Sequence, residues 1–167
     1  MTLEKKISKI FGLEGDEWLK HANPWSVWTR FIILPFIVLS IWSREWIGWY
    51  SLIPIISLSF WIYINPRFFA KPKTTNTWSS KCVMGEKIWA NRDQIEVSNN
   101  HKPIIYILTF IQIVGGIFLF SGLYQLYFWP TFTGVLVIYL AKMWFLDRMV
   151  WIFADMKDKN EYKDLLY

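Results

Sequence analysis

Cysteine, histidine and charge are all scarce in this chain of 167 residues. The single cysteine, Cys82, cannot form an internal disulfide or supply a four-thiolate zinc or iron–sulfur site. Two histidines, His21 and His101, are too few for a histidine-rich di-iron site. They are also expected at helix ends rather than facing each other within a bundle, as a pair of haem ligands would. We therefore expect neither a metal nor a cofactor.

Charged residues make up 19% of the chain, against about 25% in ordinary soluble domains. None falls between Trp46 and Ile64, and none between Pro103 and Ala141. Each of these runs is longer than the helices of about 11–12 residues that soluble domains bury. Together with a hydrophobic content of 54%, they predict an integral membrane protein. They argue against a secreted disulfide scaffold, a nucleotide-binding α/β domain and a nucleic-acid partner.

Four segments are long and apolar enough to be spanning helices, which need about 20 residues. They cover residues 25–42, 46–64, 104–123 and 131–151. Only Ser43, Arg44 and Glu45 separate the first two, so these form an antiparallel hairpin. We predict an all-α fold, a four-transmembrane-helix bundle that forms a single domain over residues 1–167.

Lysine and arginine are distributed unevenly around these spans. Arg44 is the only one in the turns on one side, whereas the N-terminal segment, the loop 65–103 and the tail are rich in both. Because cytoplasmic loops carry the excess of Lys and Arg, we expect a multi-pass protein of the cell (inner) membrane. Both termini and the loop 65–103 would be cytoplasmic.

Two shorter stretches have the pattern of amphipathic helices lying on the membrane. In the first, Lys5, Lys6 and Lys9 lie opposite an apolar face formed by Leu3, Ile7, Ile10 and Phe11. The second runs from Thr77 to Ala90, where one face carries Trp78, Cys82, Gly85 and Trp89. A solvated cytoplasmic loop is the alternative for the second stretch, because Gly85 weakens a helix.

Ionisable side chains inside the predicted spans are candidates for function, since each costs roughly 2.5–3.5 kcal/mol on insertion. All of them fall in the cytoplasmic half of the bundle. Asp147, the only carboxylate among them, needs a cation from Arg30, Lys142 or Arg148. We predict a cationic pocket open to the cytoplasm that binds an anionic lipid or small metabolite. Its candidate ligand residues are Arg30, Asp147, Arg148, His21, Asn23, Asn65 and Arg67. The alternative is an ion-pair network that only fixes the order of the helices.

Three motifs at the cytoplasmic ends of the spans combine uncommon residues in a fixed order. They are HANPWSVWTR from His21 to Arg30, NPR from Asn65 to Arg67, and WFLDRMVW from Trp144 to Trp151. With them the chain resembles a family of small, uncharacterised multi-span integral membrane proteins. The resemblance implies a compact membrane protein and brings no activity with it.

Three functions are compatible with these patterns. The leading one is a polytopic membrane protein with a cationic pocket, whose partners are membrane lipids. The second is an accessory subunit that packs against other membrane proteins or a second copy of itself. The third is a lipid-modifying membrane enzyme with His21 or Asp147 as its base. The sequence leaves open whether the protein is catalytic.

Overall fold

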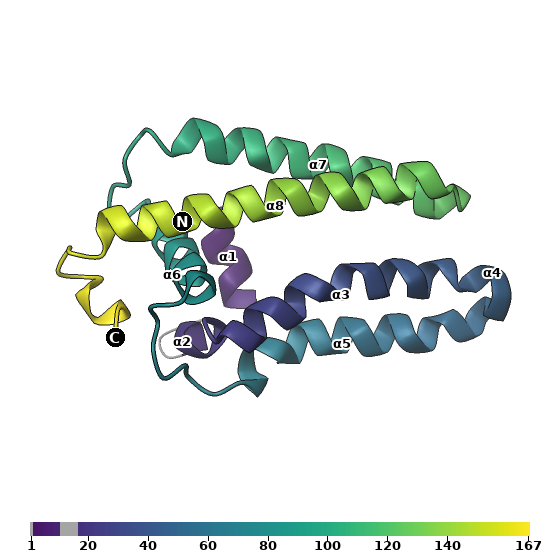
Figure 1. Cartoon of the computed structure of the whole chain (residues 1–167), viewed down its shortest axis with the longest axis horizontal. Coiled ribbons are helices and arrows are strands. Elements are labelled where there is room, and N and C mark those ends of the chain that lie inside the picture. Colours follow the sequence, from purple (N-terminus) through teal and green to yellow (C-terminus); the bar gives the residue numbers. More distant parts are fainter. Residues whose placement is uncertain (1, 11–16) are drawn as a thin grey trace.

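The computed structural model describes residues 2–10 and 17–167, and within these ranges the chain is helical without a strand. The expected all-α class is therefore confirmed. The α-helices are α1 (Leu3–Ile10), α2 (Glu17–His21), α3 (Pro24–Trp42), α4 (Arg44–Ile47), α5 (Leu52–Phe68), α6 (Trp78–Ala90), α7 (Lys102–Gln125) and α8 (Phe128–Met156). Two 3-10 helices, η1 (Gly48–Ser51) and η2 (Lys163–Leu165), complete the order. Figure 1 shows two hairpins, α3–α5 and α7–α8, extending in the same direction from an end where α1, α2, α6 and the C-terminus lie.

The first hairpin begins with a capped helix. The side-chain oxygen of Asn23 accepts a hydrogen bond of 2.9 Å from the Trp25 amide, and Pro24 follows at the first helical position. The chain reverses through α4 and η1, where Gly48 has a φ of 53°, a left-handed value that glycine adopts at little cost. Residues 44–51 form this turn, so the second helix of the hairpin starts at Leu52 instead of the expected Trp46.

The second hairpin is held by very close helix packing. A Cβ atom on Gly122 of α7 would overlap the backbone of Thr131, and one on Gly134 of α8 would overlap that of Leu119. Small residues that let two backbones approach in this way are typical of helix pairs in membranes. The α7–α8 pair is therefore the most tightly joined part of the fold.

Helix α6 crosses between the two hairpins. Its side chains Met84, Ile88 and Trp89 are buried in one cluster with residues of α8. The helix expected over residues 77–90 is thus present, but its position on the membrane surface was wrongly predicted. Cys82 is 0% and Trp89 1% exposed, because the face that carries them packs inward and buries more apolar area than a surface position would.

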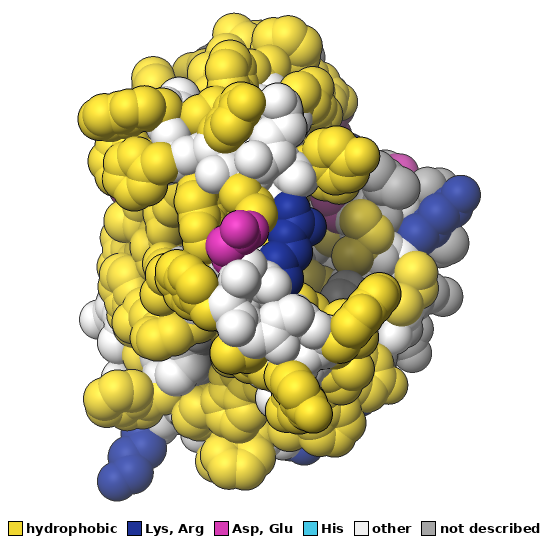
Figure 2. All heavy atoms as spheres, turned by 90° about the vertical axis from the view of Figure 1, so that its right-hand side faces the viewer, with side chains coloured by type: hydrophobic (Ala, Val, Ile, Leu, Met, Phe, Trp, Pro, Cys, Tyr) yellow, Lys and Arg dark blue, Asp and Glu magenta, His cyan; other side chains and the backbone are white. Residues whose placement is uncertain are grey.

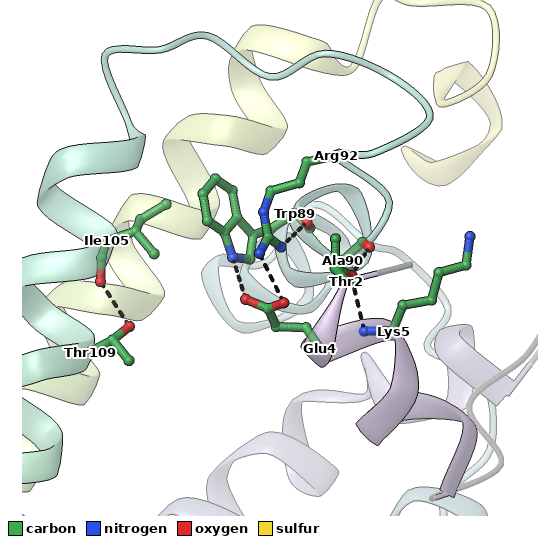
Figure 3. A network of polar contacts seen from close by, with 8 residues as sticks. All are labelled: Thr2, Glu4, Lys5, Trp89, Ala90, Arg92, Ile105 and Thr109. Carbon is green, nitrogen blue, oxygen red and sulfur yellow. Dashed lines mark hydrogen bonds and ion pairs between the residues drawn. The ribbon is translucent and has the colours of Figure 1, made fainter.

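Helix α1 is attached to α6 by polar contacts (Figure 3). One carboxylate oxygen of Glu4 accepts a hydrogen bond of 3.0 Å from the Trp89 indole, and the other pairs with Arg92 at 3.0 Å. The guanidinium of Arg92 also lies 4.1 Å from the centre of the Trp89 ring. Glu4 therefore fixes which side of α1 faces the protein.

This attachment also determines which other side chains of α1 are buried and which are exposed. Ser8, one turn after Glu4, is buried, whereas Ile7 is 46% and Ile10 is 74% exposed. The expected apolar face is thus turned outward at these two positions, while Phe11 lies outside the described residues. An outward apolar edge is compatible with contact to a lipid surface.

Two segments of the described chain are long and apolar enough to cross a membrane. They are Pro24–Phe68, whose most apolar stretch has a mean hydropathy of 1.6, and Lys102–Gln125, whose most apolar stretch has a mean hydropathy of 2.2. The first is the α3–α5 hairpin and so contains two of the four expected spans. Helix α8 is not one of these two segments, and it carries Lys142, Asp147 and Arg148 in its second half. Four spans are therefore not confirmed.

The apolar segments are mostly exposed. Within their most apolar stretches only 17% and 22% of the residues are buried, whereas a core helix of a soluble protein is mostly buried. Figure 2 shows the far end of the hairpins, where hydrophobic side chains cover most of the surface and a few charged ones lie near its centre. Such a surface is compatible with a lipid environment.

Candidate functional site

Arg30 lies in the second turn of α3, and its side chain reaches back to α2. Its guanidinium contacts both ring nitrogens of His21 and donates a hydrogen bond of 3.2 Å to the His21 carbonyl. Its Nε donates to the Ser26 carbonyl at 3.0 Å. Within residues 2–10 and 17–167, no carboxylate lies within ion-pair distance of Arg30. Its hydrogen-bond partners in the described part of the chain are thus all neutral.

His21 is neutral at pH 7. Burial lowers the pKa of its imidazole well below the usual value, and the charges of Arg30 and Lys142 lower it further. A neutral imidazole can accept a hydrogen bond from the guanidinium through one ring nitrogen. His21 therefore orients Arg30 without cancelling its charge.

Lys142 of α8 supplies the second cation, and it is paired with Glu86 of α6. The distance from Nζ to the carboxylate oxygen is 3.0 Å. Asp147 had been expected as a partner for one of the cations, and Glu86 was not among the predicted site residues. The sequence did not indicate Glu86 because this residue lies in the loop 65–103, and only the inward packing of α6 brings its carboxylate to α8.

Four of these side chains line two cavities at once. His21, Arg30, Glu86 and Lys142 belong to the lining of both, and come from α2, α3, α6 and α8. The first cavity, of about 330 Å³, lies between α3 and α8 and has apolar walls that include Phe31, Leu34 and Ile138. The second cavity, of about 360 Å³, lies beneath α1 and has walls that include Trp18, Ile62 and Trp89. We call these the inner cavity and the α1 cavity.

Charge in this cluster does not balance. Among the described residues that line both cavities, Arg30 and Lys142 are cations, Glu86 is the only acid, and His21 is neutral. The shared residues therefore leave one positive charge in excess. An uncompensated cation in a mostly apolar cavity is unfavourable, and a bound anion would offset it.

The two predicted site residues at the inner end of α8 lie elsewhere. Asp147 accepts a hydrogen bond of 3.3 Å from the Trp78 indole, and Arg148 stacks over Trp151 at 4.8 Å from the ring centre. Neither belongs to the lining of the inner cavity or of the α1 cavity. The structure thus brings Arg30 and His21 together but not with these two.

The remaining three predicted ligand residues, Asn23, Asn65 and Arg67, also have local partners. Asn23 caps α3 and donates to the Ala70 carbonyl at 2.9 Å. Asn65, fully buried, joins α5 to α3 through hydrogen bonds of 2.8 Å with Ser26 and of 2.8 Å with Thr29. The guanidinium of Arg67 lies 5.0 Å from the centre of the Tyr63 ring. The contacts of Asn23 and Asn65 link the two ends of the first hairpin, whereas that of Arg67 lies within α5.

Other reactive groups are not prepared for chemistry. Burial raises the pKa of the Cys82 thiol, and the neighbouring Glu86 raises it further, so the thiol stays protonated. In the part of the chain that the structure describes, no three His, Cys, Asp or Glu residues are grouped so as to hold a metal ion. The described cluster therefore presents two cations, Arg30 and Lys142, to a mostly apolar cavity.

Comparison with known proteins places the chain in a family. A family of unknown function (DUF6653) matches residues 2–165, and the chain belongs to it. No curated protein matches the chain. No solved structure matches it either. The family supplies no activity, so function has to be inferred from the geometry.

Proposed function

We propose that the protein is a multi-pass protein of the cell (inner) membrane that binds an anionic ligand in the inner cavity. In this arrangement α3, α5, α7 and α8 cross the bilayer as two hairpins, with α6 and both termini on the cytoplasmic side. The exposed apolar surface of the hairpins supports it. So does the concentration of Lys and Arg at the α6 end, where the positive-inside rule expects them.

Helix α8 is compatible with this proposal despite its charges. Lys142 is paired with Glu86, and Arg148 covers Trp151, so both charges are directed toward protein groups or the nearer interface. Asp147 receives the Trp78 hydrogen bond from outside the hairpins. A spanning helix can carry charged residues where neighbouring elements satisfy them.

Arg30 carries the binding proposal. Its guanidinium belongs to a hairpin that is apolar enough to cross a membrane. In the described part of the chain it donates only to neutral acceptors, and it lines the inner cavity. A guanidinium matches carboxylate or phosphate oxygens with paired donors. Lys142 lines the same cavity and has donors beyond the one that Glu86 uses. Together they form an oxyanion site.

The topology can be tested by labelling engineered cysteines in intact cells. Starting from Cys82→Ala, single substitutions Glu45→Cys, Tyr127→Cys and Lys163→Cys place a thiol in each hairpin turn and in the tail. A membrane-impermeant maleimide should label the first two from outside and the third only after permeabilisation. Labelling of Tyr127→Cys only after permeabilisation would show that α7 and α8 do not form a spanning hairpin.

The binding proposal can be tested by native mass spectrometry of the protein extracted gently from its own membrane. We expect an anionic adduct on the wild type that Arg30→Gln loses. Lys163→Ala is the matched control, because it also removes one positive charge but at an exposed position in η2, outside the cavity. A wild type without adduct, held instead in a complex with other chains, would indicate an accessory subunit.

A further inference from the structure

We infer that the ligand of the inner cavity is an anionic amphiphile, with an oxyanion headgroup on Arg30 and Lys142 and an apolar chain along the seam between α3 and α8. This inference rests on the proposed function and names its ligand class. Its basis is the way polar and apolar side chains are arranged along that seam.

The inner cavity is polar toward one end of the seam. Arg30 of α3 and Lys142 of α8 both line it. Moving away from α6, the next wall residues are Phe31 and Leu34 on α3 and Ile138 on α8. An anion at the cations therefore meets apolar walls on its outer side, and a small hydrated anion would lose its water there without replacement.

The seam continues beyond this cavity as a second apolar chamber. The outer chamber, of about 360 Å³, starts one turn after Phe31 and extends to the turns of the hairpins. Its lining comprises Pro35, Val38, Leu39, Trp42, Trp46, Phe128, Thr131, Phe132 and Val135. Apart from Thr131, whose hydroxyl donates to the Tyr127 carbonyl at 2.8 Å, the lining is formed by apolar and tryptophan side chains. It offers a wall for a hydrocarbon chain.

Phe31 and Tyr139 lie between the inner cavity and the outer chamber. Their ring centres are 4.7 Å apart, and Tyr139 reaches across the seam to the Phe31 carbonyl. At the far end, Arg44 donates to the carbonyls of Leu123 and Tyr124 at 2.6 and 2.7 Å and joins the two hairpins there. The seam is thus bridged by Arg44 at its far end and crossed once by Tyr139 in the middle.

The length of the seam fits one acyl chain. From Arg30 to Trp42 the rise of an α-helix gives about 18 Å, comparable with the roughly 15 Å that one leaflet contributes to a hydrocarbon core of about 30 Å. A chain anchored at Arg30 would pass the rings of Phe31 and Tyr139 and end in the outer chamber. Carboxylate and phosphate headgroups share the chemistry that the two cations recognise.

The test uses the full chain in nanodiscs of phosphatidylcholine, with bound molecules counted by native mass spectrometry. The probes are dodecyl phosphate, dodecanoate, inorganic phosphate and dodecanol. We expect both anionic amphiphiles to bind at least about tenfold more tightly than inorganic phosphate or dodecanol, a difference of about 1.4 kcal/mol. Arg30→Gln should abolish the preference for the charged amphiphiles.

A blocking variant separates the chain from the headgroup. Leu34→Trp fills the apolar wall of the inner cavity and should weaken binding of dodecyl phosphate about tenfold, whereas Ile32→Trp, on the exposed side of α3, should leave it unchanged. If inorganic phosphate binds as tightly as dodecyl phosphate and depends on Arg30, the chain inference is wrong and the oxyanion site stands. If dodecanol binds as well as the charged probes, or Arg30→Gln binds like wild type, the oxyanion site itself is overturned.

Discussion

The hydroxyl of Tyr139 in α8 donates a hydrogen bond of 2.8 Å to the carbonyl oxygen of Phe31 in α3. In a regular helix that carbonyl accepts from the amide four residues later, but residue 35 is a proline without an N–H. Tyr139 thus supplies from the second hairpin the donor that Pro35 lacks in the first. The bond also fixes the spacing of α3 and α8 at the middle of the seam.

Removing this hydroxyl should destabilise the protein. Tyr139→Phe leaves the Phe31 carbonyl without its donor, and we expect a loss of about 1–3 kcal/mol in the free energy of unfolding. Unfolding in mixed micelles with increasing denaturing detergent would measure it. In a Pro35→Ala background the restored amide can satisfy the same carbonyl, so Tyr139→Phe should cost less there. An equal cost in both backgrounds would show that the missing amide is not the reason for the bond.

The crossing of α6 over α8 should not tolerate a methyl group. Because a Cβ on Gly85 would overlap the Met149 carbonyl, Gly85→Ala must push the two helices apart, at a cost of about 1–3 kcal/mol. Gly116 in α7 is the matched control, since a Cβ there meets nothing within 4 Å. Gly116→Ala should raise stability by about 0.5–1 kcal/mol. Melting temperatures in one detergent compare the two, and similar losses for both would contradict the close crossing.

The hairpins could be predicted from the sequence, whereas the position of α6 could not. Uncharged runs and a short link predict helix pairs because these features are local. The face of α6 that carries Cys82 and Trp89 has the same pattern whether it meets lipid or protein. Only the approach of Gly85 to the backbone of α8 decides between the two, and that contact joins residues far apart in the chain.

The same limit explains the candidate site. Arg30 and His21 belong to one continuous motif, and the structure brings them together. Glu86 was missed because a carboxylate in a loop that is predicted to be cytoplasmic has no local sign of facing a span. Because α6 packs inward, Glu86 forms an ion pair with Lys142, and Asp147 accepts a hydrogen bond from the Trp78 indole instead. The sequence predicted Arg30 as a ligand residue but considered Lys142 only as a possible partner of Asp147, because the pairing of charges depends on tertiary contacts.

Asn65 should act on the stability of the first hairpin. Asn65→Ala leaves the hydroxyls of Ser26 and Thr29 without their partner across the α3–α5 contact, and we expect a loss of about 1–3 kcal/mol. Ser57→Ala on the same helix is the control, because Ser57 bonds only the Ile53 carbonyl of its own helix. If Asn65→Ala lost the anionic adduct but kept its melting temperature, Asn65 would bind the ligand, as the sequence predicts.

Acidification should destabilise the fold through His21. Its pKa in the folded chain is lowered by burial and by the charges of Arg30 and Lys142, so the unfolded chain binds more protons once the pH falls below about 6.5. The contribution is fully present above that pH and is lost as the pH falls toward the folded pKa, by at most about 1.4 kcal/mol per pH unit. Melting temperatures of the wild type and His21→Gln, measured from pH 7.5 to 5.5, isolate the effect. The melting temperature of the wild type should fall more than that of the variant, since Gln does not titrate. Glu86 and the His101–Asp155 pair are present in both proteins and so do not contribute to the difference. Equal losses would mean that His21 is not held neutral, and that Arg30 and Lys142 share the inner cavity with a third cation.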